Sequence, residues 1–245
     1  RRYNGNPFLV DSELTNYEVR AEYYIDRSSR VSLAGFYKDI ARPIEASSTF
    51  DDNTLITRFA NAPNATLWGL EADAQYTYDL LDLGGWFETK ALVLLANYTY
   101  TQSEIKVRAG DLTQVFPSAP VPASNLFIDG VPLTGQSDHL ANFQIGIEDV
   151  DRLQQFTVLV NYASERVTSR GTTGLPDIVE NPGLTLDLVM RQGLNLLGVE
   201  SELKLEARNI LGRDNFEYQT NGVDRIEINT YAVGTSVSAS LSIDF

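Results

Sequence analysis

The sequence predicts an all-β fold: an antiparallel up-and-down transmembrane β-barrel segment of about nine strands. Three observations predict it. Polar and apolar residues alternate over long segments, the connections between these segments are short and long in turn, and aromatic residues gather near the segment ends. A period of two is typical of a β-strand with two unlike faces, because successive side chains point to opposite sides of a sheet.

The alternation is clearest at the C-terminus, where Tyr231, Val237, Leu241 and Phe245 share a face and small residues occupy the other. Several segments exceed the five or six residues of a usual strand, and a tilted membrane-spanning strand needs roughly 9–11 residues. The expected strands are 14–26, 30–47, 56–80, 87–104, 139–149, 153–166, 183–192, 200–211 and 229–245.

The connections between these strands alternate in length. Short ones are expected at 27–29, 81–86, 150–152 and 193–199, and long ones at 48–55, 105–138, 167–182 and 212–228. Short periplasmic turns and long extracellular loops are typical of outer-membrane barrels, whereas a β-sandwich has no reason to keep this order. With the C-terminus on the periplasmic side, every long connection is expected outside the cell.

The positions of the aromatic residues indicate whether the apolar face contacts lipid or packs in a protein core. Trp68 lies near one end of its predicted strand, and Tyr76 and Tyr78 lie near the other. Aromatic residues at both ends of an aliphatic band are typical of the two interfacial girdles of a membrane barrel. A soluble β-sandwich that buries these aromatic residues in its core is the alternative.

Composition excludes several other classes of protein. The 245 residues include no cysteine, so disulfides and thiolate metal sites are excluded. A net charge of −14 lacks the basic surface of a nucleic-acid-binding protein. The longest apolar run, 91–96, is too short for a membrane-spanning helix. His139 is the only histidine, so no two-histidine metal site can form, and we expect no cofactor and no enzyme activity.

Several short motifs occur in the same order as in one known family. They are Gly5-Asn6-Pro7-Phe8-Leu9, Phe36-Tyr37-Lys38-Asp39-Ile40, Trp68-Gly69-Leu70-Glu71, Asn97-Tyr98-Thr99-Tyr100, Ala207-Arg208-Asn209-Ile210-Leu211 and the terminal strand from Tyr231 to Phe245. In this combination the chain resembles TonB-dependent outer-membrane receptors over essentially its whole length. The resemblance implies that 1–245 is the C-terminal part of a roughly 22-stranded barrel. The plug domain and the N-terminal strands are then expected outside this chain.

The resemblance also implies a function and a set of partners. Such a receptor actively imports a scarce ligand, such as a siderophore, an oligosaccharide or another nutrient, across the bacterial outer membrane. The expected partners are the remainder of the barrel and the plug domain, the TonB complex, the outer-membrane assembly machinery, and the bilayer with its lipopolysaccharide. The small-molecule ligand is not identified, and no nucleic acid is expected. A passive porin-like channel and a soluble β-sandwich binding module are the alternatives.

Three groups of residues are candidates for these roles. A ligand is expected to contact the long connection at 105–138, through Asp111, Gln114, Phe116, Asn125, Phe127 and Asp129, although an inert ordered lid is an equal alternative. The polar strand faces are expected to line the lumen and meet the plug through Glu71, Asp73, Gln75, Glu202, Lys204, Glu206 and Arg208. Phe245, a terminal aromatic residue on an alternating strand, is the expected assembly signal, with a girdle residue as the alternative.

Overall fold

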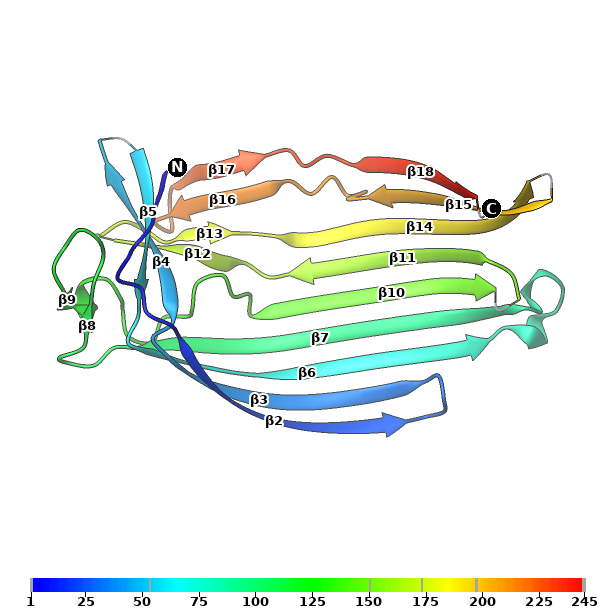
Figure 1. Ribbon diagram of the computed structural model, residues 1–245, viewed down its shortest axis with the longest axis horizontal. Coiled ribbons are helices and arrows are strands. Elements are labelled where there is room, and N and C mark those ends of the chain that lie inside the picture. Colours follow the sequence, from blue (N-terminus) through cyan, green and yellow to red (C-terminus); the bar gives the residue numbers. More distant parts are fainter. Residues whose placement is uncertain (1, 53, 150, 173, 197, 244–245) are drawn as a thin grey trace.

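A computed structural model describes residues 2–52, 54–149, 151–172, 174–196 and 198–243 of the chain. Its larger sheet has nine antiparallel strands in the order β18-β15-β14-β11-β10-β7-β6-β3-β2 (Figure 1). The strands are β2 (Glu13–Tyr24), β3 (Arg30–Ala41), β6 (Asn64–Asp79), β7 (Lys90–Lys106), β10 (His139–Asp149), β11 (Gln154–Ala163), β14 (Gly183–Leu196), β15 (Val199–Arg208) and β18 (Ser236–Ile243). The prediction of a nine-stranded antiparallel barrel segment is confirmed.

Short turns join the strands at one end of this sheet, and long excursions join them at the other (Figure 1). Three of the short turns follow one design. The Asp26 carboxylate accepts the backbone N–H groups of Ser28 and Ser29 at 2.7 and 2.8 Å, and these bonds lower its pKa. Asp149 and Asn195 accept backbone N–H groups in the turns after β10 and β14. A single side-chain oxygen thus closes each turn.

The long excursions and the N-terminal strand β1 build a second sheet of seven strands, in the order β1-β5-β4-β12-β13-β16-β17 (Figure 1). Its strands are β1 (Arg2–Asn4), β4 (Ile44–Asp51), β5 (Thr54–Asn61), β12 (Arg166–Gly171), β13 (Ile178–Glu180), β16 (Asn215–Thr220) and β17 (Arg225–Tyr231). The remaining elements are β8 (Leu112–Thr113), β9 (Val121–Pro122) and the short 3-10 helices Leu81–Leu83, Gly85–Phe87 and Ala123–Asn125. In the described part of the chain, no helix has the length and apolar character to cross a membrane.

Two predicted strands each contain two observed strands. The segment 30–47 breaks at Arg42, which adopts a left-handed backbone with φ 56°, and at Pro43, which lacks a backbone N–H. The segment 56–80 breaks at Pro63 between β5 and β6. The prediction of a loop at 48–55 is wrong for most of its residues, because 48–51 belong to β4 and 54–55 to β5, and these two strands pair as an antiparallel hairpin. Alternation reports which face a side chain takes and not which strand is its partner, so it does not by itself identify the change of sheet.

The predicted last strand, 229–245, is also divided. β17 ends at Tyr231, and β18 begins at Ser236 after Gly234, which has a φ of 72°. Tyr231 therefore lies in the seven-stranded sheet, which corrects its assignment to one face with Val237 and Leu241. The φ at Gly234 is one that residues with a side chain rarely adopt, so the glycine permits the change of direction.

The apolar face of the nine-stranded sheet is exposed. Val19 is 80% exposed, Leu33 58% and Leu70 51%, and no second sheet covers this face in the described part of the chain. A soluble sandwich would bury these side chains between its two sheets. The exposure therefore contradicts the sandwich alternative and suits contact with lipid chains.

Aromatic side chains occupy both ends of this apolar face. Trp68 contacts Tyr100 edge-on, with ring centroids 5.8 Å apart, at the end nearer the long excursions. At the short-turn end, Tyr76 stacks with Tyr78, and Trp86 contacts Phe87. This distribution is the one expected of two interfacial girdles.

Gly69, part of the Trp68-Gly69-Leu70-Glu71 motif, lies where two neighbours approach the backbone of β6. A Cβ atom added at Gly69 would lie 2.3 Å from the carbonyl oxygen of Tyr100 and 2.6 Å from Cζ of Phe36. The Phe36 ring therefore covers the glycine on the polar face. No residue with a side chain fits at Gly69 unless the β6–β7 pair shifts.

A cluster of buried apolar residues lies at the loop end, around the ends of β6 and β7. It consists of Ala60, Ala62, Ala65, Ile105, Ala123, Phe127 and Leu133. These residues come from the β4–β5 hairpin, the adjoining ends of β6 and β7, and the excursion after β7. This apolar cluster joins the hairpin to the excursion, so the two form one packed unit.

Candidate functional site

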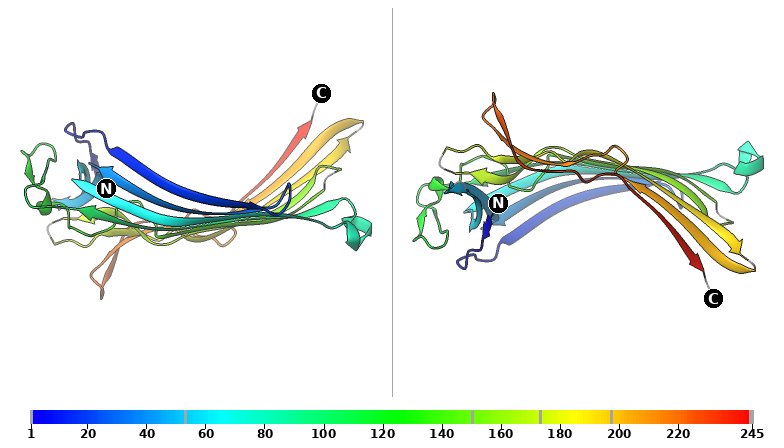
Figure 2. Two further views of the ribbon diagram at one scale, coloured as in Figure 1. Left: turned by 90° about the horizontal axis from the view of Figure 1, so that it is seen from below. Right: turned by 90° about the horizontal axis from the view of Figure 1, so that it is seen from above.

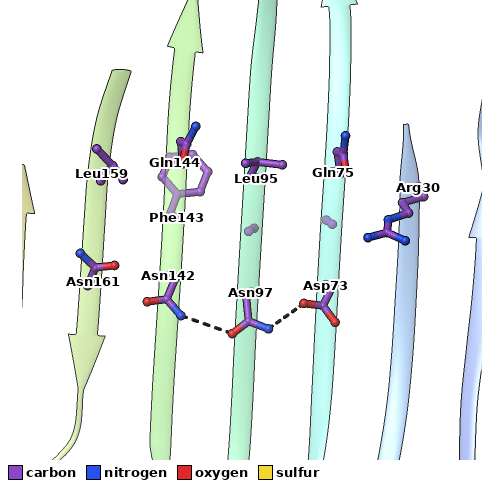
Figure 3. Close-up of a pocket in the computed structure, with 12 residues that line it drawn as sticks. Arg30, Asp73, Gln75, Leu95, Asn97, Asn142, Phe143, Gln144, Leu159 and Asn161 are labelled. Carbon is purple, nitrogen blue, oxygen red and sulfur yellow. Dashed lines mark hydrogen bonds between the residues drawn. The ribbon is translucent and has the colours of Figure 1, made fainter. Parts of the chain in front are cut away.

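A row of polar side chains crosses the polar face of the nine-stranded sheet at one level (Figure 3). Asp73 lies opposite Asn97, Asn97 opposite Asn142, and Asn142 opposite Asn161 in the register of four neighbouring strands. Ser32 lies opposite Asp73 and extends the row to β3. Directly opposed residues point to the same face of a sheet, with Cβ atoms roughly 5 Å apart. The strand register therefore aligns these side chains.

Hydrogen bonds connect the row. The Asn97 amide donates from Nδ2 to Asp73 Oδ1 at 2.7 Å and to Glu71 Oε1 at 3.3 Å. Asn142 Nδ2 donates to Asn97 Oδ1 at 3.4 Å, and Ser32 Oγ donates to Asp73 Oδ2 at 3.2 Å. The Asp73 carboxylate thus accepts from both sides, while Asn97 both donates and accepts. Each bond fixes the orientation of the next side chain.

Arg20 of β2 adds a positive charge to this network. Its guanidinium reaches across β3 to Glu71 at 3.6 Å and to Asp73 at 3.7 Å, and it also pairs with Glu18 at 3.3 Å. The intervening residue is Ala34, whose small side chain leaves room for the arginine. Ion pairs at this exposure stabilise a fold only slightly, so Arg20 mainly balances the two carboxylates.

A shallow cavity of about 300 Å³ follows the row. Its polar lining includes Arg30, Asp73, Gln75, Asn97, Asn142, Gln144 and Asn161, and Leu95 and Leu159 add an apolar patch (Figure 3). The cavity offers amide donors and acceptors side by side. Among the described residues no cluster of three metal-ligating side chains occurs. The arrangement is suited to hydrogen bonding with a protein surface, water or a polar solute.

A second polar cluster lies on β14 and β15. Arg191 binds Glu202 through two hydrogen bonds, Nε to Oε1 at 2.6 Å and Nη2 to Oε2 at 2.9 Å. Lys204 and Arg208 both contact Glu206, at 3.0 and 3.2 Å. The four predicted residues of β15 therefore share one face, and each of their charges has a partner of opposite sign.

The structure brings together part of the predicted set. Glu71 and Asp73 share the Asn97 amide, and Gln75 lines the same cavity, whereas the β15 residues form the separate cluster with Arg191. The prediction omitted Arg20, Asn97, Asn142 and Arg191. Alternation could have assigned each of them to a polar face, but the cross-strand register that joins them is not visible in the sequence.

The predicted ligand contacts in 105–138 have different roles in the structure. Asp111 accepts the backbone N–H of Arg108, and Asp129 accepts that of Val107, both at 2.8 Å, so both carboxylates shape the loop. Gln114 donates to the Ser118 carbonyl at 3.0 Å. These side chains hold the excursion in its conformation.

The other three predicted contacts differ in exposure. Phe116 is half exposed, with its ring 6.0 Å from that of Phe8, and Asn125 is exposed at the end of a 3-10 helix. Phe127 is buried in the apolar cluster. A solute can therefore reach Phe116 and Asn125, whereas Phe127 packs the loop. Phe245 lies outside the described residues, and its role stays a prediction.

His139 begins β10 and lies on the apolar face, where its Nδ1 is 2.7 Å from the hydroxyl oxygen of Tyr98. Its ring also lies 5.2 Å from that of Tyr100. The histidine thus belongs to the aromatic group at the loop end of the sheet.

Asn209, within the Ala207-Arg208-Asn209-Ile210-Leu211 motif, connects three segments at the loop end. Its Oδ1 accepts the Arg213 N–H at 2.8 Å, and its Nδ2 donates to the carbonyls of Arg213 and Gly234, each at 2.9 Å. Its own N–H donates to Asp187 at 2.7 Å. Asn209 has a φ of 52°, a conformation that asparagine tolerates better than most residues. A cavity of about 340 Å³ adjoins it, lined partly by Arg208.

Long antiparallel strands with one exposed apolar face and one hydrogen-bonded polar face define this chain as part of the wall of an outer-membrane β-barrel. The family model described as TonB dependent receptor-like, beta-barrel matches residues 1–210. The chain therefore belongs to the TonB-dependent receptor family. Neither a curated protein nor a solved structure matches the chain.

Membership of this family has three consequences. The protein is a component of the bacterial outer membrane, it takes part in transport, and it is a transporter and not an enzyme. The predictions of family, location and non-enzymatic function are confirmed. The family does not identify the ligand.

Proposed function

We propose that this chain is part of the wall of an energy-coupled importer for a scarce ligand, such as a siderophore, an oligosaccharide or another nutrient. The observation that supports this most directly is the hydrogen-bonded row from Ser32 through Asp73 and Asn97 to Asn142. Lipid chains offer no hydrogen bonds, so such a row faces the interior of a barrel. A plug domain, moved by the TonB complex, is the partner that the family implies there.

We also propose that 1–245 supplies the C-terminal strands of a larger barrel, with the plug and the other strands outside this chain. In the described residues, β2 and β18 form the two edges of the nine-stranded sheet. An open edge at membrane depth leaves backbone groups without partners, so further strands are needed to close the barrel. The terminal Phe245 is proposed as the signal that the assembly machinery reads.

In this proposal the polar face meets the plug or wets the transport path. Its contact residues are Glu71, Asp73, Gln75, Glu202, Lys204, Glu206 and Arg208. The carboxylates on β6 are held by Asn97 and Arg20, and those on β15 are held by basic neighbours. Fixed polar groups can exchange hydrogen bonds with a moving plug at little cost in side-chain entropy.

Ligand capture is proposed for the excursion at 105–138, with Asp111, Gln114, Phe116, Asn125, Phe127 and Asp129 as the candidate set. Phe116 and Asn125 are the members with the exposure needed for direct contact. The two aspartates, Gln114 and the buried Phe127 would act by holding the loop in shape.

A growth experiment tests the proposal and does not require the ligand to be identified first. The native bacterium and a strain that lacks this protein are compared on a panel of single iron and carbon sources, each in the presence and absence of TonB. A source whose use requires both this protein and TonB is the expected result. A source that requires the protein but not TonB would instead indicate a passive porin-like channel.

A further inference from the structure

The β4–β5 hairpin crosses the loop end of the sheet and reaches a distant strand. It connects β3 to β6, but β4 pairs in parallel with β12, which follows β11 on the other side of β7 and β10. Figure 2 shows β4 and β5 towards the concave side of the curved sheet, which is the inside of the arc. The hairpin therefore extends over the mouth of a barrel built on this arc.

The hairpin and the excursion after β7 form one packed body, here called the cap and defined as residues 44–52, 54–61 and 107–134. The apolar cluster holds its two parts together, with Ala60 from the hairpin, Ala62 directly after it, and Phe127 and Leu133 from the excursion. Glu45, which is buried, accepts the Thr134 backbone N–H at 3.0 Å. Apolar burial of this kind resists separation.

The contact between the cap and β12 is of another kind. It consists of two cross-strand pairs, Ser47 with Arg170 and Ser48 with Gly171, and is here called the seam. Ser48 Oγ lies 2.6 Å from Ser169 Oγ, and the Ser48 carbonyl accepts two bonds of 3.1 Å from Thr172. The seam is short and polar, and water can replace each of these hydrogen bonds once the seam opens.

Polar atoms without partners lie along the same contact. In the described residues, the buried side-chain nitrogen and oxygen atoms that lack a hydrogen bond belong to Arg58, Gln136 and Arg170. Arg170 lies in the seam and is 5% exposed, and Arg58 lies opposite its partner Ser47. Gln136 follows Gly135, whose N–H donates to β12.

These unpaired groups oppose closure. An unpaired buried donor or acceptor lacks the hydrogen bonds that water would give it, and this loss destabilises the closed state. The guanidinium of Arg170 has one hydrogen-bond partner, Asp177, at 2.6 Å, and its charge also attracts the Glu45 carboxylate of the cap, but its Nε and one Nη have no hydrogen bond. Opening along the seam would hydrate these atoms and leave the apolar cluster intact.

We infer that the cap is a lid over the barrel mouth that opens as one body along the seam between β4 and β12. The two serines at the seam, Ser48 and Ser169, separate in this motion, whereas residues of the apolar cluster stay buried. The inference goes beyond the proposed transport function, and it can be tested without a ligand.

Thiol labelling in intact cells tests the opening. The chain has no cysteine, so Ser169→Cys or Ala65→Cys introduces a single thiol into it, with any cysteine elsewhere in the receptor replaced. Both positions are fully buried in the closed structure, Ser169 beside the seam and Ala65 in the apolar cluster. With a membrane-impermeant maleimide, Ser169→Cys is expected to react at least tenfold faster. Equal rates, or no reaction at either site, would overturn the inference.

Two engineered disulfides that share one position provide a second test. Ser48→Cys with Ser169→Cys bridges the seam, and Ser48→Cys with Thr57→Cys only joins β4 to β5, where the hydroxyl oxygens lie 3.0 Å apart. Trypsin cleavage after the buried Arg170 reports opening. The seam disulfide is expected to slow this cleavage at least tenfold until dithiothreitol is added, and the hairpin disulfide is expected to leave it unchanged. Unchanged cleavage with the seam bridged would refute the lid.

Both readouts are independent of import. If the growth experiment finds no TonB-dependent nutrient while labelling and cleavage behave as expected, the transport proposal fails and the lid stands. If import is found and the seam stays closed to maleimide and trypsin, the lid fails and the transport proposal stands.

Discussion

Replacement of Asn209 tests how the chain leaves β15. The side chain makes three hydrogen bonds to backbone groups, two to Arg213 and one to Gly234. These bonds hold the start of the excursion after β15 against the segment that leads into β18. Asn209→Ala removes all three and places an alanine at a φ of 52°.

The structure sets the expected magnitude. Three hydrogen bonds at about 0.5–1.5 kcal/mol each give about 1.5–4.5 kcal/mol for their loss. A left-handed backbone adds about 1 kcal/mol for alanine, whereas glycine adopts it readily. Asn209→Gly is therefore expected to lower the free energy of unfolding by about 1 kcal/mol less than Asn209→Ala.

The assay is a urea titration of the complete receptor in phospholipid vesicles, with the folded fraction read from its mobility on an unheated gel. Asn215→Ala is the matched control, because Asn215 makes one exposed bond of 3.2 Å, to the Asn229 carbonyl. Asn215→Ala should change the free energy of unfolding by less than about 0.5 kcal/mol. If Asn209→Ala behaves like the control, the assignment of Asn209 as a joint between three segments is wrong.

Three further outcomes are expected. Burial raises the pKa of Glu45, so the charged carboxylate weakens the folded cap, and stability falls as the pH rises from the pKa of an unfolded glutamate through the higher folded value. Glu45→Gln should remove this fall in a urea titration repeated across pH, and a fall that persists would exclude Glu45 as its source. Gly69→Ala should destabilise by about 1–3 kcal/mol because its Cβ meets backbone, while Gly35→Ala, which meets only Leu70 Cδ2 at 3.5 Å, should be nearly neutral in the same assay. Deletion of Phe245 should reduce the amount of folded barrel in the outer membrane, and unchanged amounts would disprove its role in assembly.

The sequence by itself determined the barrel strands and their faces. A membrane barrel exposes one apolar face to lipid, and each strand therefore shows its period of two without help from its neighbours. The polar positions of β6 and β15, such as Glu71 and Glu202, could be assigned in this way, as could the short turns closed by Asp26 and Asp149. The single apolar face also indicated that the strands contact lipid, because aromatic residues lie at both of its ends.

Strand partners were decided by the tertiary structure alone. The alternation from Tyr231 and Val233 continues past Gly234 to Val237, although the chain leaves one sheet for another there, so this pattern gave no sign of the change. The alignment of Asp73 with Asn97 depends on register, which is a property of two strands together.

The loop end shows most clearly which features follow from local sequence and which depend on tertiary structure. A single aromatic residue in a polar loop, such as Phe127, has the same local sequence character whether it is exposed or buried. Its burial depends on Ala60 and Ala62, residues more than sixty positions away, and the pairing of β4 with β12 spans a still greater separation. Local periodicity records the faces of each strand, whereas contacts between distant segments are selected only when the whole chain packs.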